Sequence, residues 1–195
     1  MGGKAYANKK QAHKQPEGNF YPTPKSLIWV AEHIIKQEFT PNSTILEPCC
    51  GNGMISMELE KMGYTVKNND LFTQPQGVDY LTMDTDYPYV ISNPPFSLWD
   101  EFVKHAKKTA QKIMFIGRLN YFGTHSRLIS GVWENLKSVY CFDRYVDYRT
   151  PEREDGKFHV GAMATGWFIW DMEYVGLPSI QVLSVQKYAV LGNKT

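Results

Sequence analysis

A chain of 195 residues can form one domain with a full hydrophobic core and is too short for two comfortable ones. Hydrophobic residues make up 43% and charged residues 21%, as in soluble globular proteins, and no apolar run approaches the roughly 18 residues that span a bilayer. A formal net charge of +1 is low for a protein that grips many phosphates, so any nucleic-acid contact is small or its positive charge is local.

The three cysteines give neither a disulfide framework nor the paired spacing of a zinc site. The amino terminus carries no apolar signal core. We therefore expect a cytoplasmic protein in a reducing compartment, with no metal and no membrane contact. Nothing in the sequence indicates an oligomeric state.

Residues 1–19 lack an apolar period and carry four lysines against one glutamate. We expect a flexible polar tail there, with a nucleic-acid arm as the alternative. A helix follows, for which Thr23 is the predicted cap and Pro24 the first position. Its apolar stripe predicts one buried face and consists of Leu27, Ile28, Ala31, Ile34 and Ile35.

A strand at residues 43–46 leads into Glu47-Pro48-x-x-Gly51-x-Gly53, and a helix is expected from about residue 54 to 62. The glycines allow backbone conformations and a close approach that a side chain would block. The loop lacks the Gly-Lys-Ser/Thr ending of a phosphate loop and the third glycine of the dinucleotide fingerprint. An acidic residue here fits a cofactor with a cationic amine better than it fits a phosphate.

The next two strands end in polar residues. The strand at 64–69 stops at Asp70, whose carboxylate can accept two ribose hydroxyls or simply end the strand in a turn. The strand at 89–91 precedes Asn93-Pro94-Pro95-Phe96, and the two prolines prevent further backbone pairing. Asn93 is thus held extended where open α/β sheets bind ligands, and this segment can grip a planar group that bears an NH2.

Six further elements are expected after this segment: an amphipathic helix at 98–106, a buried strand at 112–117, a helix from about 123 to 136, strands at 139–142 and 167–170, and an edge strand at 180–185. The polar stretch 144–166 is too long for a simple connection and is a candidate lid or substrate loop. His125 can be a base, although a lone histidine beside a serine is more typical of a loop or cap.

The Asn-Pro-Pro-Phe and Glu-Pro-x-x-Gly-x-Gly motifs resemble the catalytic motif and cofactor loop of S-adenosylmethionine-dependent amino-methyltransferases. The match is closest to the small, phage-type N6-adenine DNA methyltransferases. The resemblance implies an α/β, three-layer Rossmann-like fold, with a mostly parallel seven-stranded sheet that has one antiparallel strand. It implies one methyltransferase domain over residues 20–195 and no separate target-recognition domain.

The resemblance also assigns site residues. The catalytic segment is Asn93, Pro94, Pro95 and Phe96. The implied S-adenosylmethionine-binding residues are Phe20, Tyr21, Thr23, Pro24, Glu47, Pro48, Cys49, Gly51, Gly53, Asp70, Asp79 and Tyr80. Asp79 would accept from the cofactor's adenine amine, with Asp84 and Asp86 as rivals. Arg118, Asn120 and Tyr121 are the implied substrate-binding residues.

The predicted function is methyl transfer from S-adenosylmethionine to the N6 amine of adenine in DNA. Enzymes with the same motif methylate RNA base amines and protein glutamine amides, so both remain alternatives. The Phe20-Tyr21 motif before the loop, the Arg118-Leu119-Asn120 stretch and the compact length favour DNA adenine. A catalytically silent binding subunit is a further alternative, although the intact Asn-Pro-Pro segment and glycines favour an enzyme.

Overall fold

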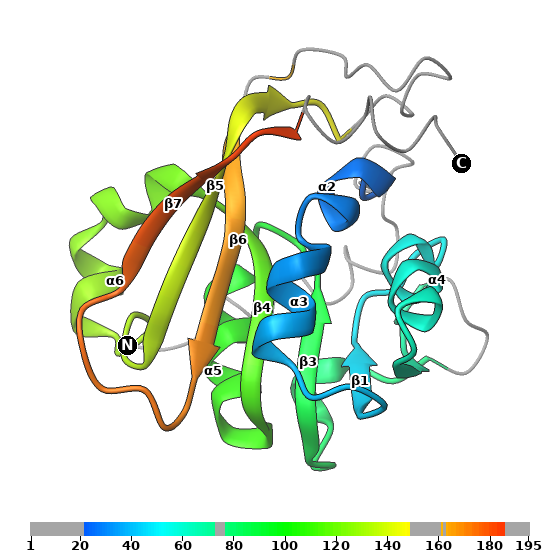
Figure 1. Ribbon diagram of the computed structural model, residues 1–195. Coiled ribbons are helices and arrows are strands. Elements are labelled where there is room, and N and C mark those ends of the chain that lie inside the picture. Colours follow the sequence, from blue (N-terminus) through cyan, green and yellow to red (C-terminus); the bar gives the residue numbers. More distant parts are fainter. Residues whose placement is uncertain (1–21, 73–76, 149–160, 162, 186–195) are drawn as a thin grey trace.

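The structure, a computed structural model, describes residues 22–72, 77–148, 161 and 163–185 (Figure 1). Seven strands form one sheet in the order β2-β1-β3-β4-β6-β5-β7. Their bounds are β1 Thr44–Glu47, β2 Thr65–Asn68, β3 Tyr87–Ser92, β4 Ala110–Arg118, β5 Leu136–Val146, β6 Met163–Asp171 and β7 Ser179–Leu183. Each strand that the sequence predicts is present, and the last of them lies at the predicted sheet edge.

One strand runs against all the others. β6 pairs antiparallel with both β4 and β5, whereas the remaining neighbours pair in parallel. In Figure 1 the arrows of β1 and β3 point upward and that of β6 points downward. The expected mostly parallel, seven-stranded sheet with one antiparallel strand is therefore confirmed.

The helices are α2 Lys25–Trp29, α3 Glu32–Glu38, α4 Met54–Lys61, α5 Trp99–Thr109 and α6 His125–Ile129, with 3-10 turns η3 Tyr80–Thr82 and η4 Leu119–Gly123. The single helix predicted after Thr23 is wrong, because a tight turn in which the Ala31 amide bonds the Ile28 carbonyl separates α2 from α3. The helix predicted to reach residue 136 is also wrong. It stops at Ile129, just before Gly131 adopts a φ of 75°.

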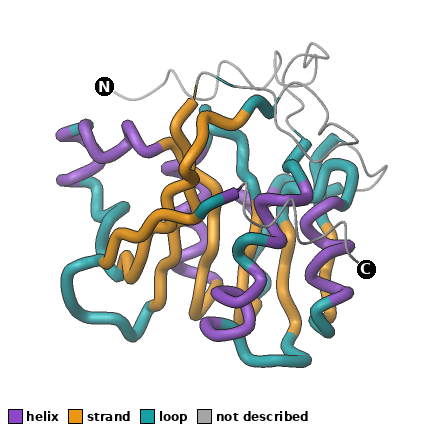
Figure 2. Tube along the Cα trace, turned by 45° about the horizontal axis from the view of Figure 1, so that its top comes forward, coloured by secondary structure: helices purple, strands orange, loops and turns teal. Residues whose placement is uncertain are grey.

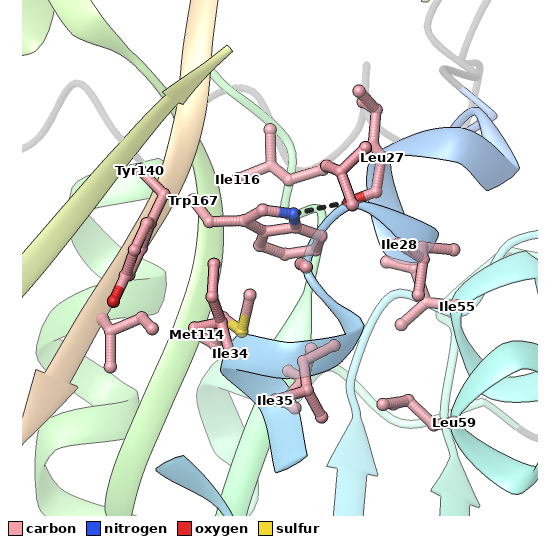
Figure 3. Packing of buried hydrophobic residues seen from close by; sticks show 14 of the residues in the cluster. Leu27, Ile28, Ile34, Ile35, Ile55, Leu59, Met114, Ile116, Tyr140 and Trp167 are labelled. Atoms are coloured by element: carbon pink, nitrogen blue, oxygen red, sulfur yellow. Dashed lines mark hydrogen bonds between the residues drawn. The ribbon is translucent and has the colours of Figure 1, made fainter. Parts of the chain in front are cut away.

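Helices lie on both faces of the sheet (Figure 2). Alternating strand side chains bury against these two helix layers, as a period of two requires. In β4, Met114 and Ile116 face the layer that contains α2, α3 and α4, whereas Ile113 and Phe115 face α5. Figure 3 shows the first layer, where the Trp167 indole N–H donates to the Leu27 carbonyl at 2.9 Å. No helix in the described part of the chain is long and apolar enough to cross a membrane.

The second layer centres on Trp99 of α5, which is fully buried. Its indole N–H donates to the Ile116 carbonyl at 2.9 Å, and its ring lies 4.8 Å from that of Tyr121. A Cβ on Gly117 would come within 2.8 Å of the Trp99 ring, so this position of β4 accepts only glycine without a shift. The packing anchors the segment that follows β4.

Candidate active site at the carboxyl ends of the central strands

The glycine loop after β1 is joined to the tip of β2. Backbone bonds run from the Asn69 amide to the Glu47 carbonyl at 2.9 Å and from the Cys50 amide to the Asn69 carbonyl at 3.0 Å. Gly51 and Gly53 have φ values of 51° and 76°, a left-handed region that side chains rarely tolerate, and Gly53 then opens α4. The predicted strand–loop–helix arrangement is confirmed.

Asp70 lies against this loop and is only 8% exposed. Its Oδ2 accepts from the Gly51 amide at 2.9 Å and its Oδ1 from the Phe72 amide at 2.8 Å. The two backbone bonds fix the orientation of the carboxylate beside the glycines.

Glu47 lies beneath the loop at 1% exposure. It contacts the Ser56 hydroxyl of α4, which in turn contacts the Asn68 side chain at the end of β2. Burial raises the pKa of Glu47 to about 8; the Ser56 hydrogen bond opposes the rise and the negative charge of Asp70 adds to it. Near neutral pH Glu47 therefore keeps its proton and links β1, β2 and α4, and its direct contact with a cofactor amine stays a prediction.

Asn69 was not singled out by sequence reasoning, yet its side chain joins two parts of the site. Its Nδ2 donates to the Val78 carbonyl at 2.8 Å and its Oδ1 accepts from the Val78 amide at 3.0 Å. This pair brings Asp79 to the tip of β2. The only sequence signal is a polar residue beside Asp70 at a strand end, which is too common to be diagnostic.

Asp79 caps the short η3 helix, since its Oδ1 accepts from the Leu81 amide at 3.1 Å. Tyr80 is buried, with its ring 5.1 Å from Phe102 and 4.6 Å from His105. The rivals Asp84 and Asp86 are exposed. Asp79 is half-buried and follows Val78, the residue bonded to Asn69, whereas Tyr80 belongs to the core.

Thr23 does not cap α2, which corrects the sequence prediction. The helix begins at Lys25 after Pro24, with no side-chain cap. Thr23 is only 7% exposed, and its hydroxyl instead accepts a hydrogen bond from Asn93 Nδ2 at 3.1 Å. Because the nitrogen end of the Asn93 amide is held by Thr23, its carbonyl end is turned away from that hydroxyl.

Phe96 brings two of the predicted substrate residues together. The Arg118 guanidinium carbon lies 4.9 Å from the Phe96 ring centre, and the Tyr121 hydroxyl donates to the Phe96 carbonyl at 3.1 Å. Asn120 lies exposed in η4 and shares none of these bonds.

Sequence reasoning missed Tyr148, whose ring meets the Phe96 ring edge-on at 5.8 Å. Its buried hydroxyl pairs with Thr165 at 2.9 Å. No motif marks Tyr148, which lies inside the stretch 144–166 that the sequence predicts as a loop. β5 extends to Val146 and β6 starts at Met163, so both ends of that stretch are strand; residues 149–160 lie outside the described part.

The remaining predictions concern Pro48 and Cys49, the residues before position 22, and metal ligands. Pro48 is buried, and burial raises the pKa of the Cys49 thiol well above its usual range, which makes it a poor nucleophile. Phe20, Tyr21 and the 1–19 tail lie outside the described residues. Within the residues that the structure describes, no three His, Cys, Asp or Glu side chains gather as metal ligands would.

The strand order and the helices on both faces give the chain a Rossmann-like fold, which it shares with solved structures of methyltransferases. One similar structure is a type I restriction-modification methyltransferase subunit from Streptococcus thermophilus, with a TM-score of 0.58 and 12% identity over 85% of this chain and 47% of that one. Another, described as a candidate RNA methyltransferase from Pyrococcus horikoshii, has a TM-score of 0.58 and 16% identity over 81% of this chain and 91% of that one. No protein-family profile and no curated protein sequence matches the chain.

Proposed function

We propose that the protein transfers a methyl group from S-adenosylmethionine to the exocyclic N6 amine of adenine in DNA. The observation that carries the proposal is the Asn93–Thr23 hydrogen bond, which orients the amide of the Asn-Pro-Pro-Phe segment. That segment and the glycine loop follow β3 and β1, which are parallel neighbours, so both lie at the same edge of the sheet.

The residues at the ends of β1 and β2 fit S-adenosylmethionine. Asp70 is a fixed carboxylate that suits ribose hydroxyls, and Asp79, which follows the Val78 held by Asn69, is the proposed acceptor for an adenine amine. A Cβ on Gly53 would meet no atom within 4 Å, which leaves this side of the loop open. The cofactor supplies a methyl group made electrophilic by its sulfonium.

The chain's own residues raise the nucleophilicity of the target amine. The Asn93 oxygen and the Pro94 carbonyl accept from its two hydrogens and draw the nitrogen toward tetrahedral geometry, which frees its lone pair. Such fixed dipoles act on charge that develops in the transition state. No strong base is required, because the amine becomes acidic only once methylated and its proton then leaves to water.

Phe96 holds the target base by stacking, a contact worth on the order of 1–3 kcal/mol in single-strand binders. A base in a duplex must first be flipped out of the stack. The solved structures of similar fold include both a restriction-modification subunit and a candidate RNA methyltransferase, so the choice of DNA adenine rests on the sequence motifs. The amide of a protein glutamine offers the same planar NH2.

Asn93→Ala tests the proposal. We expect methyl transfer to an adenine-containing oligonucleotide to fall on the order of 10²-fold or more, because the fixed acceptor is lost. S-adenosylmethionine binding, followed by calorimetry, should stay within about twofold of the native affinity, since no cofactor contact is removed. Activity near the native rate in this variant would refute the role of Asn93.

Asp70→Ala is the reciprocal variant. Loss of a charged acceptor should weaken S-adenosylmethionine binding about 10- to 100-fold before it affects the chemical step. Unchanged cofactor affinity would remove Asp70 from the ribose site. Tritiated methyl transfer onto DNA, RNA and protein in parallel separates the three substrate classes, and no transfer onto any of them indicates a silent binding subunit.

A further inference from the structure

Two arginines near the Asn-Pro-Pro-Phe segment each lie over an aromatic ring. The Arg118 guanidinium carbon, at the end of β4, is 4.9 Å from the Phe96 ring centre. That of Arg127, in α6, is 4.1 Å from the Tyr121 ring centre. The two rings are themselves connected through the Tyr121 hydroxyl and the Phe96 carbonyl.

The arginines differ in what satisfies their N–H donors. Arg127 Nε donates to Asp100 at 2.6 Å and its Nη1 donates to Thr124 at 3.1 Å. For Arg118, no carboxylate of the described chain lies within 4.0 Å, and its Nε is buried without a hydrogen-bond partner. A buried donor on a charged group is costly to leave unpaired, and a guanidinium matches the oxygens of a carboxylate or phosphate.

The place of Arg118 in the sheet indicates which ligand would bring a carboxylate or phosphate to it. β3 lies between β1 and β4, so Asn93 separates Arg118 from the glycine loop. The carboxylates that suit the cofactor, Asp70 and Asp79, lie on the β1–β2 side. An anion at Arg118 therefore comes with the substrate, on the far side of the target amine from the cofactor.

We infer that Arg118 binds a backbone phosphate of a nucleic-acid substrate, next to the nucleotide whose base stacks on Phe96. The inference rests on the proposed function, because it takes residues 93–96 as the site of the target amine. It gives the site a preference for nucleic acid, since a protein glutamine offers no phosphodiester. A net charge of +1 agrees with a contact that involves few phosphates.

The test is the salt dependence of binding to an adenine-containing DNA oligonucleotide, single-stranded and duplex, measured by fluorescence anisotropy with the full chain. Arg118→Met keeps an unbranched apolar stem beside Phe96 and removes the charge. We expect about 10-fold weaker binding at low salt and a slope of log K against log salt that is shallower by about one. Arg118→Lys should restore the native slope. Arg127 is the matched control, because it also lies over an aromatic ring, and Arg127→Met should leave the native slope unchanged.

Three results would overturn the inference. The first is an unchanged salt slope in Arg118→Met, and the second is a slope that becomes equally shallow in Arg127→Met. The third is an Arg118→Met variant that loses affinity for S-adenosylmethionine and not for the oligonucleotide. Arg118→Gln provides the same comparison if the methionine variant does not fold. An RNA oligonucleotide of the same sequence forms a second arm, in which an Arg118-dependent slope supports a phosphate contact with RNA as the substrate. Native protein that shows the slope but transfers no methyl group would refute the proposed function and leave the phosphate contact standing.

Discussion

The two halves of the sheet's carboxyl edge are built differently. On the β1–β2 side, backbone amides and the side chain of Asn69 hold Asp70 and the glycine loop, and Glu47 is buried beneath them. On the β3–β4 side, arginines lie over the rings of Phe96 and Tyr121. The acidic half suits a ligand with hydroxyls and amines, and the cationic aromatic half suits a base with its phosphate.

The two halves also differ in how many of their buried polar groups have hydrogen-bond partners. The Asp70 oxygens and the Asn69 side chain have hydrogen-bond partners, whereas the buried Nε of Arg118 has none among the residues that the structure describes. The β1–β2 half is therefore ordered by the chain itself, whereas the β3–β4 half keeps one buried donor for the phosphate that we infer. Loss of the buried Glu47 carboxyl in the first half should affect the pH dependence of stability, and loss of the contact that positions Asn93 in the second half should affect methyl transfer.

The largest expected effect is in the first half, from Glu47→Gln. Burial raises the pKa of Glu47 from its ordinary 4.5 to about 8, so between these values the folded protein keeps a proton that the unfolded chain releases. The free energy of unfolding must then fall as pH rises from about 4.5 to 8, by on the order of 3–5 kcal/mol, and level off above 8. Glutamine stays neutral, so the variant should lack this fall.

Urea unfolding at several pH values between 5 and 8 measures the difference between the two proteins. Glu60→Gln is the matched control, because it removes a carboxylate from an exposed position of α4, the helix that provides Ser56. A pH slope that is the same in native and Glu47→Gln protein would show that Glu47 is not held neutral. A neutral Glu47 would then not be what links β1, β2 and α4.

The two halves also differ in how far the sequence predicted them. The glycine loop, the strand ending at Asp70 and the proline segment follow local rules, because strand ends and glycine positions fix the backbone wherever the chain lies. The contacts of Thr23 with Asn93 and of Tyr148 with Phe96 join residues far apart in the sequence. Only the assembled sheet brings these pairs together, and no spacing rule could reveal them.

Thr23→Val tests the second half with an intermediate effect. Loss of the hydroxyl lets the Asn93 amide rotate, and misplacement of a positioned group can cost up to about 100-fold. We expect kcat for methyl transfer to fall about 10- to 100-fold, with the S-adenosylmethionine affinity unchanged. Thr23→Ser keeps the acceptor and should restore kcat to within a fewfold of native. Weaker cofactor binding in Thr23→Val with an unchanged kcat would instead show that Thr23 contributes to cofactor binding and does not position Asn93.

The smallest expected effect comes from Gly117→Ala, which acts on the anchor of the β3–β4 half. The new Cβ would lie 2.8 Å from the Trp99 ring, which is confined by Tyr121 and cannot withdraw without repacking. Overpacking should lower the free energy of unfolding by about 1–2 kcal/mol and outweigh the smaller gain from a less flexible unfolded chain. Gly123→Ala is the matched control, since a Cβ there meets no atom within 4 Å and the unfolded-chain gain should dominate. In urea unfolding, the free energy of unfolding should therefore fall in Gly117→Ala and rise in Gly123→Ala. A change of the same sign and size in both variants would show that Trp99 does not hold the segment that carries Arg118.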